Sequence, residues 1–349
     1  MSERAAALVI GASVGGLTAA AYLARAGLHT LLLEAGRAPR EPDGALIALD
    51  PRMASELRLA ASGLSFAARD LPMAIGGDMP LLLGRDLFAA SATLAKFSDA
   101  DALAWPTWRR RLTAEARRLR RWWWTAPQDG APDAAWSAGA REAFRHLCFS
   151  GADAYLQARF ETPSLLAGLM WDAGAGGFAV SEPGSALALV WRAAQEMAGL
   201  QEAAAIAHPG TLTGSLTRAL GMAQLRTETR VTRIFTKSGG VTGVALADGS
   251  HIEADHIIST LSRAKTLALA GLPHIVPSVA EAKILLRVAP DFAVPDSPPA
   301  RHILAARPGI HADAHEAARA GRIPADLPLE WVTLAPGARQ SGFSRRQAR

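Results

Sequence analysis

The chain has little cysteine, little lysine and no long apolar run. Its single cysteine, Cys148, excludes an intrachain disulfide and a thiolate metal cluster, so we expect a reducing compartment: the cytoplasm, or the mitochondrial matrix in a eukaryote. No apolar run is long enough to cross a bilayer, and we expect no secretory signal. The net charge of +5 comes from arginines spread over many segments, so we expect no nucleic acid as a partner.

The length and composition fit two folded domains. The chain has 349 residues, of which 50% are hydrophobic and 20% are charged. A chain of this size can bury enough apolar surface for two separate cores. We therefore expect a globular protein rather than a disordered one.

The first 36 residues have the pattern of a strand, a glycine turn, a helix and a second strand. An apolar run over 5–10 stops at Gly11, a helical stretch follows over 17–26, and a second apolar run over 30–33 leads into Glu34. This order is typical of the βαβ unit that binds dinucleotides. The helix N-terminus would face the phosphates, and Glu34 can accept hydrogen bonds from a ribose that has no 2′-phosphate.

Three positions of this turn approach the pyrophosphate in such a unit, and here they are Gly11, Ser13 and Gly16. The first glycine permits the tight turn, and the third lets the helix pack closely on the strand. Ser13 stands where bare backbone normally meets a phosphate oxygen. Either its hydroxyl donates to the phosphate, or its side chain weakens cofactor binding; in the extreme case the scaffold binds no nucleotide.

An arginine- and tryptophan-rich segment spans residues 105–124. Trp105, Trp108 and a triplet at 122–124 bracket a run of arginines. One interpretation is a helix with a solvated arginine face and tryptophans packed beneath it. The alternative is an interfacial helix that gives peripheral membrane contact, with arginines at lipid headgroups and tryptophans at acyl chains.

The middle of the chain has a helical pattern and the later part a β pattern. Spacing and capping residues predict helices over 51–59, 86–94, 99–112, 138–160, 163–169, 185–197 and 212–222. Strand-like segments cover 64–75 and 79–83. Alternation and turn residues then predict strands over 225–235, 241–246 and 251–258, which completes an α/β fold.

Residues 9–17 with Glu34, joined to 229–234, 243–249 and 254–259, resemble a known family. These segments are similar to the FAD-dependent phytoene desaturase-like oxidoreductases. Within them the chain most resembles the branch of the pyridine nucleotide-disulfide oxidoreductase domain-containing protein 2. The likeness extends over residues 5–330.

The resemblance implies FAD as the cofactor. It places the turn at the pyrophosphate, Glu34 at the adenosine ribose, the backbone of Val231 at the adenine, and Ser259 with Thr260 at the end of a strand that returns under the pyrophosphate. The cofactor-binding residues that we expect are Gly11, Ser13, Gly15, Gly16, Glu34, Val231 and Ser259.

The family also implies a fold and a reaction. We expect a Rossmann-like FAD domain from residues 1–50 and 205–272, an inserted and largely helical substrate or cap region from 51–204, and a further part of the substrate region with a truncated tail from 273–349. The implied reaction acts on C–C bonds of a lipophilic small-molecule substrate, with hydride transfer to the flavin.

Departures from the family leave two alternatives open. In the loop after Glu34, a single Gly44 stands where the family has a Gly-Gly pair, and we expect the family's C-terminal flavin-contacting segment to be missing. The second hypothesis is therefore a truncated or degenerate, non-catalytic member that acts on a protein partner as an interaction or regulatory protein. A third is an NAD-binding dehydrogenase without flavin, which leaves the late strands unexplained.

The sequence assigns no catalytic residue and no metal site. Flavin-dependent oxidation requires little more from the protein than orientation of the substrate. His311 and His315 lie one helical turn apart, a spacing that can hold a metal, but a solvated helix is the preferred interpretation. Cys148 is expected to be buried, without a partner for redox cycling.

Overall fold

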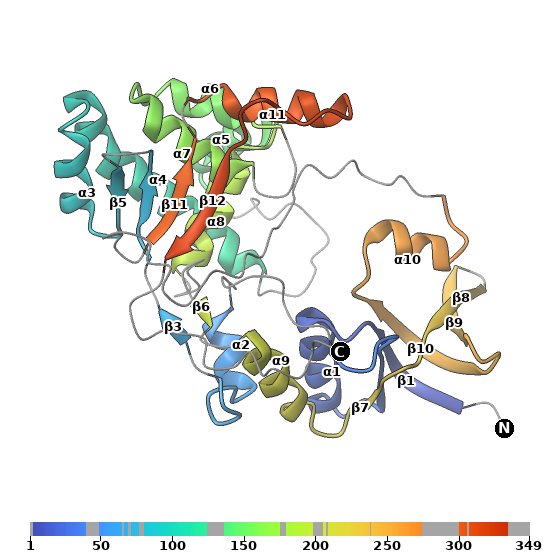
Figure 1. Ribbon diagram of the computed structural model, residues 1–349. Coiled ribbons are helices and arrows are strands. Elements are labelled where there is room, and N and C mark those ends of the chain that lie inside the picture. The colour runs from blue at the N-terminus through green and yellow to red at the C-terminus, as the bar shows by residue number, and fades with distance from the viewer. Residues whose placement is uncertain are drawn as a thin grey trace, which may run out of the picture.

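The computed structural model describes residues 3–39, 49–64, 66–68, 71–76, 80–123, 136–174, 179–197, 205–206, 209–237, 239–273, 300–305 and 307–333. In this part of the chain two sheets, each with its own helices, form the main units (Figure 1). A short third sheet pairs β3 (Phe66–Ala68) with β6 (Ala205–Ile206).

The first unit contains a six-stranded sheet. Its strands in spatial order are β7 (Gln224–Arg226), β2 (Thr30–Leu33), β1 (Glu3–Ile10), β10 (His251–Ser259), β9 (Gly240–Leu246) and β8 (Val231–Lys237). The first four are parallel to one another, and β9 and β8 continue the sheet in antiparallel fashion. This arrangement confirms the predicted α/β fold with a Rossmann-like nucleotide-binding domain.

Strands β1 and β2 are both interior strands of this sheet, and most of their residues are buried. Leu8 belongs to a core cluster with Ile234 and Val244 of the β8–β9 hairpin. Val9, which points to the other face, packs in the cluster that contains Leu17 of α1 (Val14–Arg25). Parallel strands covered on both faces have continuous apolar sequences, and this explains the run at residues 5–10.

Helices α1, α9 (Pro209–Arg218) and α2 (Pro51–Glu56) lie together beside the sheet (Figure 1). Leu17, Leu59 and Leu216 are fully buried in their shared core. Residues 49–64 therefore pack with the nucleotide-binding unit, although the sequence suggests that the substrate region begins at residue 51.

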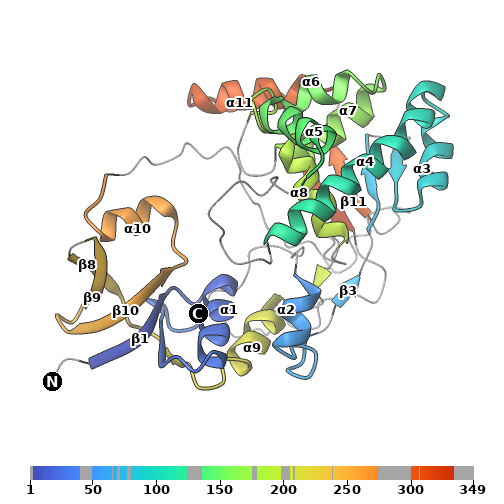
Figure 2. The same cartoon turned by 180° about the vertical axis from the view of Figure 1, so that it is seen from behind.

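The second unit is built on a four-stranded sheet. Its order is β12 (Leu329–Thr333), β11 (Ala300–Leu304), β4 (Met73–Ile75) and β5 (Leu81–Leu83). Its helices are α3 (Leu87–Leu94), α4 (Asp99–Trp123), α5 (Ala138–Phe149), α6 (Ala152–Gln157), α7 (Pro163–Ala173), α8 (Leu187–Met197) and α11 (Ile310–Arg319). Figure 2 shows α4 and α8 in front of β11, and from the opposite side the strands lie in front of the helices (Figure 1).

Helix α4 carries the arginine-rich segment. Trp105 and Trp108 are 4% exposed and pack against Phe160, with ring centroids 6.1 and 5.3 Å away. These two tryptophans therefore lie under the helix, as the first interpretation of this segment expects. The side chains of the triplet at 122–124 lie outside the described residues, and membrane contact stays a prediction. Among the described helices, none has both the length and the hydropathy needed to cross a bilayer.

Two predicted elements are interrupted by tertiary contacts. The helix predicted over 138–160 breaks at Ser150 and Gly151, because the Ser150 carbonyl accepts from Gly184 N and a Cβ at Gly151 would lie 2.8 Å from the Ser181 carbonyl oxygen. The strand predicted over 225–235 breaks at 227–230, where Glu228 has a φ of 53°. The local sequence pattern reveals neither the contacts at Ser150 and Gly151 nor the backbone conformation at Glu228.

Candidate functional site

The β1–α1 turn is tight enough to require glycine at two positions. Gly11 has a φ of 93°, and a Cβ there would lie 2.8 Å from Thr260 Oγ1. A Cβ at Gly16 would lie 1.9 Å from the Gly11 carbonyl oxygen, which no side chain can tolerate. At Gly15 the closest atom to an added Cβ would be 3.8 Å away, so that position is open. The first and third glycines thus have the steric roles predicted for them.

Ser13 caps helix α1 with its side chain. Its Oγ accepts a hydrogen bond from Gly16 N at 3.3 Å and donates one to Thr260 Oγ1 at 3.0 Å. A hydroxyl has one proton, and here that proton is directed to Thr260. The Gly16 N–H, one of the helix N-terminal donors that a phosphate would use, is already bonded to Ser13.

Thr260 packs against the β1–α1 turn and is hydrogen-bonded to its backbone. Its backbone N donates to the Ile10 carbonyl at 2.9 Å, and its Oγ1 lies 3.1 and 3.0 Å from the carbonyl oxygens of Ile10 and Gly11. Ser259, which we expected at this place together with Thr260, instead lies 2.8 Å from Thr266 Oγ1 of α10 (Arg263–Leu269). Alternation along β10 could have indicated this, because neighbouring side chains of a strand point to opposite faces.

Glu34 joins the turn to the end of β2. Its Oε2 accepts from Ala12 N and its Oε1 accepts from Gly36 N, both at 2.8 Å. Each carboxylate oxygen retains a further lone pair, so Glu34 can also accept from ribose hydroxyls. The negative charge would repel a 2′-phosphate.

The segment before Val231 runs along Glu34. Thr229 N donates to the Glu34 carbonyl and Glu228 N donates to the Gly36 carbonyl, both at 2.8 Å. Val231 follows at the start of β8 and is half-buried. Its predicted role at the adenine stays a prediction, but it lies two residues beyond the backbone that borders the ribose acid.

Together these residues fit the ADP half of a dinucleotide. The β1–α1 turn can close in this way only because Gly11 and Gly16 lack a Cβ, and the first turn of α1 has no acidic residue to oppose an anion. In this cradle Ser13 occupies the Gly16 N–H and Glu34 occupies the Ala12 N–H.

The second unit presents an apolar surface on its sheet. Leu82 pairs with Ala74, Ala74 with His302, and His302 with Trp331, so these four side chains form a row across the strands. His302 and Trp331 stack with ring centroids 5.1 Å apart and an interplanar angle of 7°. We define the apolar face as Ala74, Leu82, His302, Leu304, Leu329 and Trp331. Its leucines and Trp331 are 37–49% exposed, whereas Ala74 and His302 in the middle of the row are buried.

The opposite side of this sheet is fixed by a buried ion network. Arg301 donates to Asp172 of α7 at 2.9 Å and to Glu330 of β12 at 2.8 Å, and Trp171 Nε1 also donates to Glu330. Burial raises the pKa of Asp172, while the neighbouring Arg301 opposes that rise. The two carboxylates raise the pKa of Arg301 against the effect of its burial. Arg301 and Glu330 therefore lie on the side of the sheet that faces α7, and the apolar face lies on the other side.

His311 does not form a ligand pair with His315. Its Nε2 lies 2.7 Å from the Ala167 carbonyl oxygen and its ring lies beside Trp171. Burial lowers the pKa of His311. The solvated helix that we expected is therefore wrong for His311, which attaches α11 to α7. Among the described residues no group of histidine, cysteine and carboxylate side chains could hold a metal ion, and Cys148 is half-buried.

The strand order and the glycine cradle define a Rossmann-type dinucleotide-binding protein. In agreement, residues 9–40 match the profile of the NAD(P)-binding Rossmann-like domain. Residues 64–284 match the profile of the flavin containing amine oxidoreductases. The chain belongs to this flavin-containing oxidoreductase family, which confirms the prediction of an FAD-type flavoprotein fold. A comparison with curated proteins finds no match.

Solved structures share this fold. A double mutant of putrescine oxidase, made to redesign its cofactor binding, has a TM-score of 0.51 and 15% identity over 79% of this chain. A single mutant of the same enzyme has a TM-score of 0.50 and 15% identity over 75% of this chain and 58% of that one. A Pyrococcus furiosus protein has a TM-score of 0.48 and 19% identity, covering 77% of this chain and 61% of that one. This chain covers 62% of the double mutant.

Proposed function

We propose that the protein is an FAD-dependent oxidoreductase that acts on an apolar substrate. One observation carries the proposal: the same chain has a nucleotide cradle around Gly11 and Gly16 and an exposed apolar face on a second sheet. Exposed apolar surfaces of this kind are typical of binding sites. A nucleotide-binding module alone would not need the second surface.

The chemistry of the apolar face favours a lipophilic molecule over an amine. Putrescine oxidase is named for a diamine, and carboxylates form the strongest hydrogen bonds with ammonium groups. The described residues of the apolar face include no carboxylate, since Glu330 points to the opposite side and pairs with Arg301. Together with the resemblance to phytoene desaturase-like proteins, this supports oxidation at a C–C bond.

The residues of the chain would bind the cofactor and orient the substrate. Glu34 would hold the adenosine ribose, the N-terminus of α1 the pyrophosphate, and the backbone at Val231 the adenine. A bound flavin supplies an acceptor for the hydride of a C–H bond. The apolar face would hold the substrate and exclude water from it, and no acid or base of the chain is assigned to the reaction.

A second candidate function is that of a non-catalytic family member that serves as an interaction or regulatory protein. The bond from Gly16 N to Ser13 supports it, because a phosphate would have to compete for that donor. Weak nucleotide binding would follow if the serine kept its position.

The visible absorption spectrum of the purified protein distinguishes the oxidoreductase from the non-catalytic family member. We expect a flavin spectrum that persists after incubation with FAD and removal of the excess by desalting. A protein that stays colourless would reject the oxidoreductase proposal and favour the second candidate.

The substrate class is tested on the flavin-loaded protein under anaerobic conditions. A lipophilic polyene in detergent micelles should bleach the flavin absorbance, and putrescine should not. Trp331→Ala should slow this bleaching about tenfold, as expected when a large apolar contact is removed. Leu103→Ala, which changes an 81% exposed leucine of α4 outside the apolar face, is the matched control and should leave the rate unchanged. Bleaching by putrescine alone would reject the apolar substrate.

A further inference from the structure

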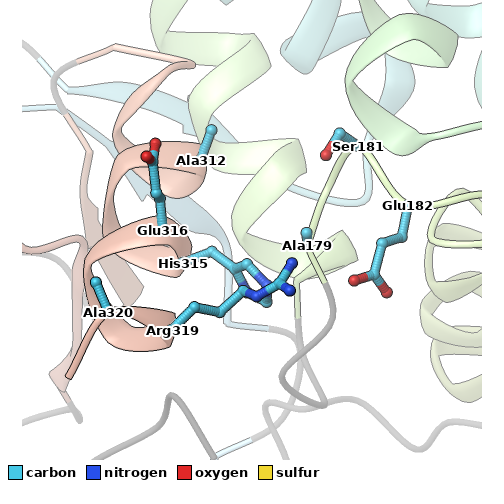
Figure 3. A pocket seen from close by; sticks show the side chains of 8 residues that line it. All are labelled: Ala179, Ser181, Glu182, Ala312, His315, Glu316, Arg319 and Ala320. Carbon is cyan, nitrogen blue, oxygen red and sulfur yellow. The ribbon is translucent and has the colours of Figure 1, made fainter. Parts of the chain in front are cut away.

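A hollow lies between α11 and the segment 179–182, outside the cradle and the apolar face. Its volume is about 530 Å³, within the range of about 300–1,000 Å³ that is usual for small-ligand sites. Figure 3 shows His315 and Arg319 extending from α11 towards the segment that bears Glu182. Ala179 and Ala312 are small apolar residues of its lining.

Both walls of the hollow are held in place by buried contacts. Helix α11 is attached to α7 by the bond from His311 to the Ala167 carbonyl and by buried Ile310. In the other wall, the Val180 carbonyl accepts from Asp153 N and from the buried Ser185 hydroxyl. The hollow is therefore a preformed feature of the fold, and a ligand would not have to order its walls.

The hollow is lined by charged side chains of both signs. Arg319 and His315 provide N–H donors from α11, and Glu182 provides a carboxylate from the facing segment. Glu316, a second carboxylate on α11, points away from that segment. None of these four side chains forms a hydrogen bond or an ion pair with another residue in the part of the chain that the structure describes. Their hydrogen-bonding capacity is thus available to a ligand.

We infer that this hollow binds a small zwitterion of the α-amino acid type. The carboxylate of the ligand would accept from the Arg319 guanidinium, which is suited to paired hydrogen bonds, and from the His315 ring. Its ammonium group would face Glu182, and its aliphatic part would lie on the alanines. A purely anionic ligand would be repelled by Glu182 and Glu316, and a purely cationic one by Arg319.

Binding of leucine and of two analogues to the full-length chain tests this inference. The analogues are 3-methylbutylamine, which lacks the carboxylate, and 4-methylpentanoate, which lacks the ammonium. Calorimetric titration should show binding of leucine, with each analogue at least tenfold weaker. Because the readout is binding, it does not depend on a flavin, and the result is independent of the proposed oxidoreductase function.

Variants assign the binding to the hollow. Arg319→Ala and Glu182→Gln should each weaken leucine binding at least tenfold, since each removes the partner of one charged group. Arg322→Ala removes an exposed arginine three residues away that does not line the hollow, and it should bind like the unchanged protein. The inference is overturned if leucine does not bind, if it binds no better than both analogues, or if the two variants bind it normally. Circular dichroism of each variant checks that the fold is retained.

Discussion

The hydroxyl oxygens of Ser13 and Thr260 lie 3.0 Å apart and connect the β1–α1 turn to the residue after β10. Ser13 donates in this bond, and its oxygen also accepts from Gly16 N. For Ser13 to donate to a phosphate, its proton must leave Thr260. The Ser13–Thr260 pair therefore determines which donors a nucleotide meets at this turn.

Ser13→Gly should tighten FAD binding about tenfold. The change frees the Gly16 N–H for a charge-assisted bond to the phosphate, and such bonds contribute about 1.5–3 kcal/mol. Stability should fall by only a few tenths of a kcal/mol, because glycine is itself an acceptable N-cap. Fluorescence titration of FAD measures the affinity.

Ser13→Ala is the matched variant, since it removes the hydroxyl and keeps the Cβ. Tighter binding by Ser13→Gly alone would show that the Cβ is the obstacle, and tighter binding by both would implicate the hydroxyl. Weaker binding by both would contradict our expectation and would mean that the serine donates to the phosphate.

Gly16→Ala should destabilise the nucleotide-binding unit by about 1–3 kcal/mol, as forced overpacking does. The added Cβ would lie 1.9 Å from the Gly11 carbonyl oxygen, so β1 and α1 would have to separate. Gly15→Ala is the control: its Cβ would meet nothing closer than 3.8 Å, and alanine favours a helix over glycine. Urea unfolding of the two variants should separate them, and equal stability would show that the turn is looser than described.

Arg301→Met should destabilise the second unit by about 3–5 kcal/mol. The substitution keeps much of the side-chain volume but leaves Asp172 and Glu330 without their shared cation in a buried site. Thermal unfolding followed by circular dichroism measures the loss. Arg4→Met, which removes the exposed ion pair with Asp255, should leave the unfolding temperature almost unchanged. A similar effect of both variants would refute a structural role for the buried network.

The pKa of Tyr22 predicts a loss of stability at high pH. Burial and the hydrogen bond to Glu56 raise this pKa from 10.0 to about 12 in the folded protein. A group whose pKa rises on folding stabilises the fold below its unfolded pKa, and this contribution disappears as the pH passes the folded pKa. The free energy of unfolding should therefore decline between pH 10 and 12.

In Tyr22→Phe, the decline of the free energy of unfolding between pH 10 and 12 that comes from Tyr22 should be absent. Tyr155→Phe changes the other of the two tyrosines and should keep it. Urea unfolding across the same pH range provides the comparison, and an identical decline in both variants would contradict the assignment to Tyr22.

The nucleotide cradle could be predicted because its requirements are local. Gly11, Gly16 and Glu34 lie within one βαβ unit, and strand, turn and helix signals occur in the order of the contacts that they make. The role of Thr260, in contrast, arises from a partner 250 positions away in the chain, Ile10. Alternation along β10 indicates that Ser259 and Thr260 point to opposite faces, but it does not indicate which of them lies at the turn.

The apolar face could not be predicted for a related reason. Leu82, His302 and Trp331 come from three strands whose register is set by tertiary pairing, and β11 and β12 are short. Likewise, the interpretation of His311 and His315 as part of a solvated helix was wrong for His311, because the Ala167 carbonyl that contacts it is distant in sequence. Elements whose stability depends on remote partners leave a weak local pattern.

The central position of β1 also has a consequence for synthesis of the chain. Strand β1 is made before the other strands of its sheet, yet one of its two neighbours, β10, is made about 250 positions later, as the pair Ile10 and Thr260 illustrates. At about 5–20 residues per second, a ribosome would need more than ten seconds to supply that neighbour. Until then one edge of β1 is open to wrong pairing, so we expect the newborn chain to depend on protection of that edge.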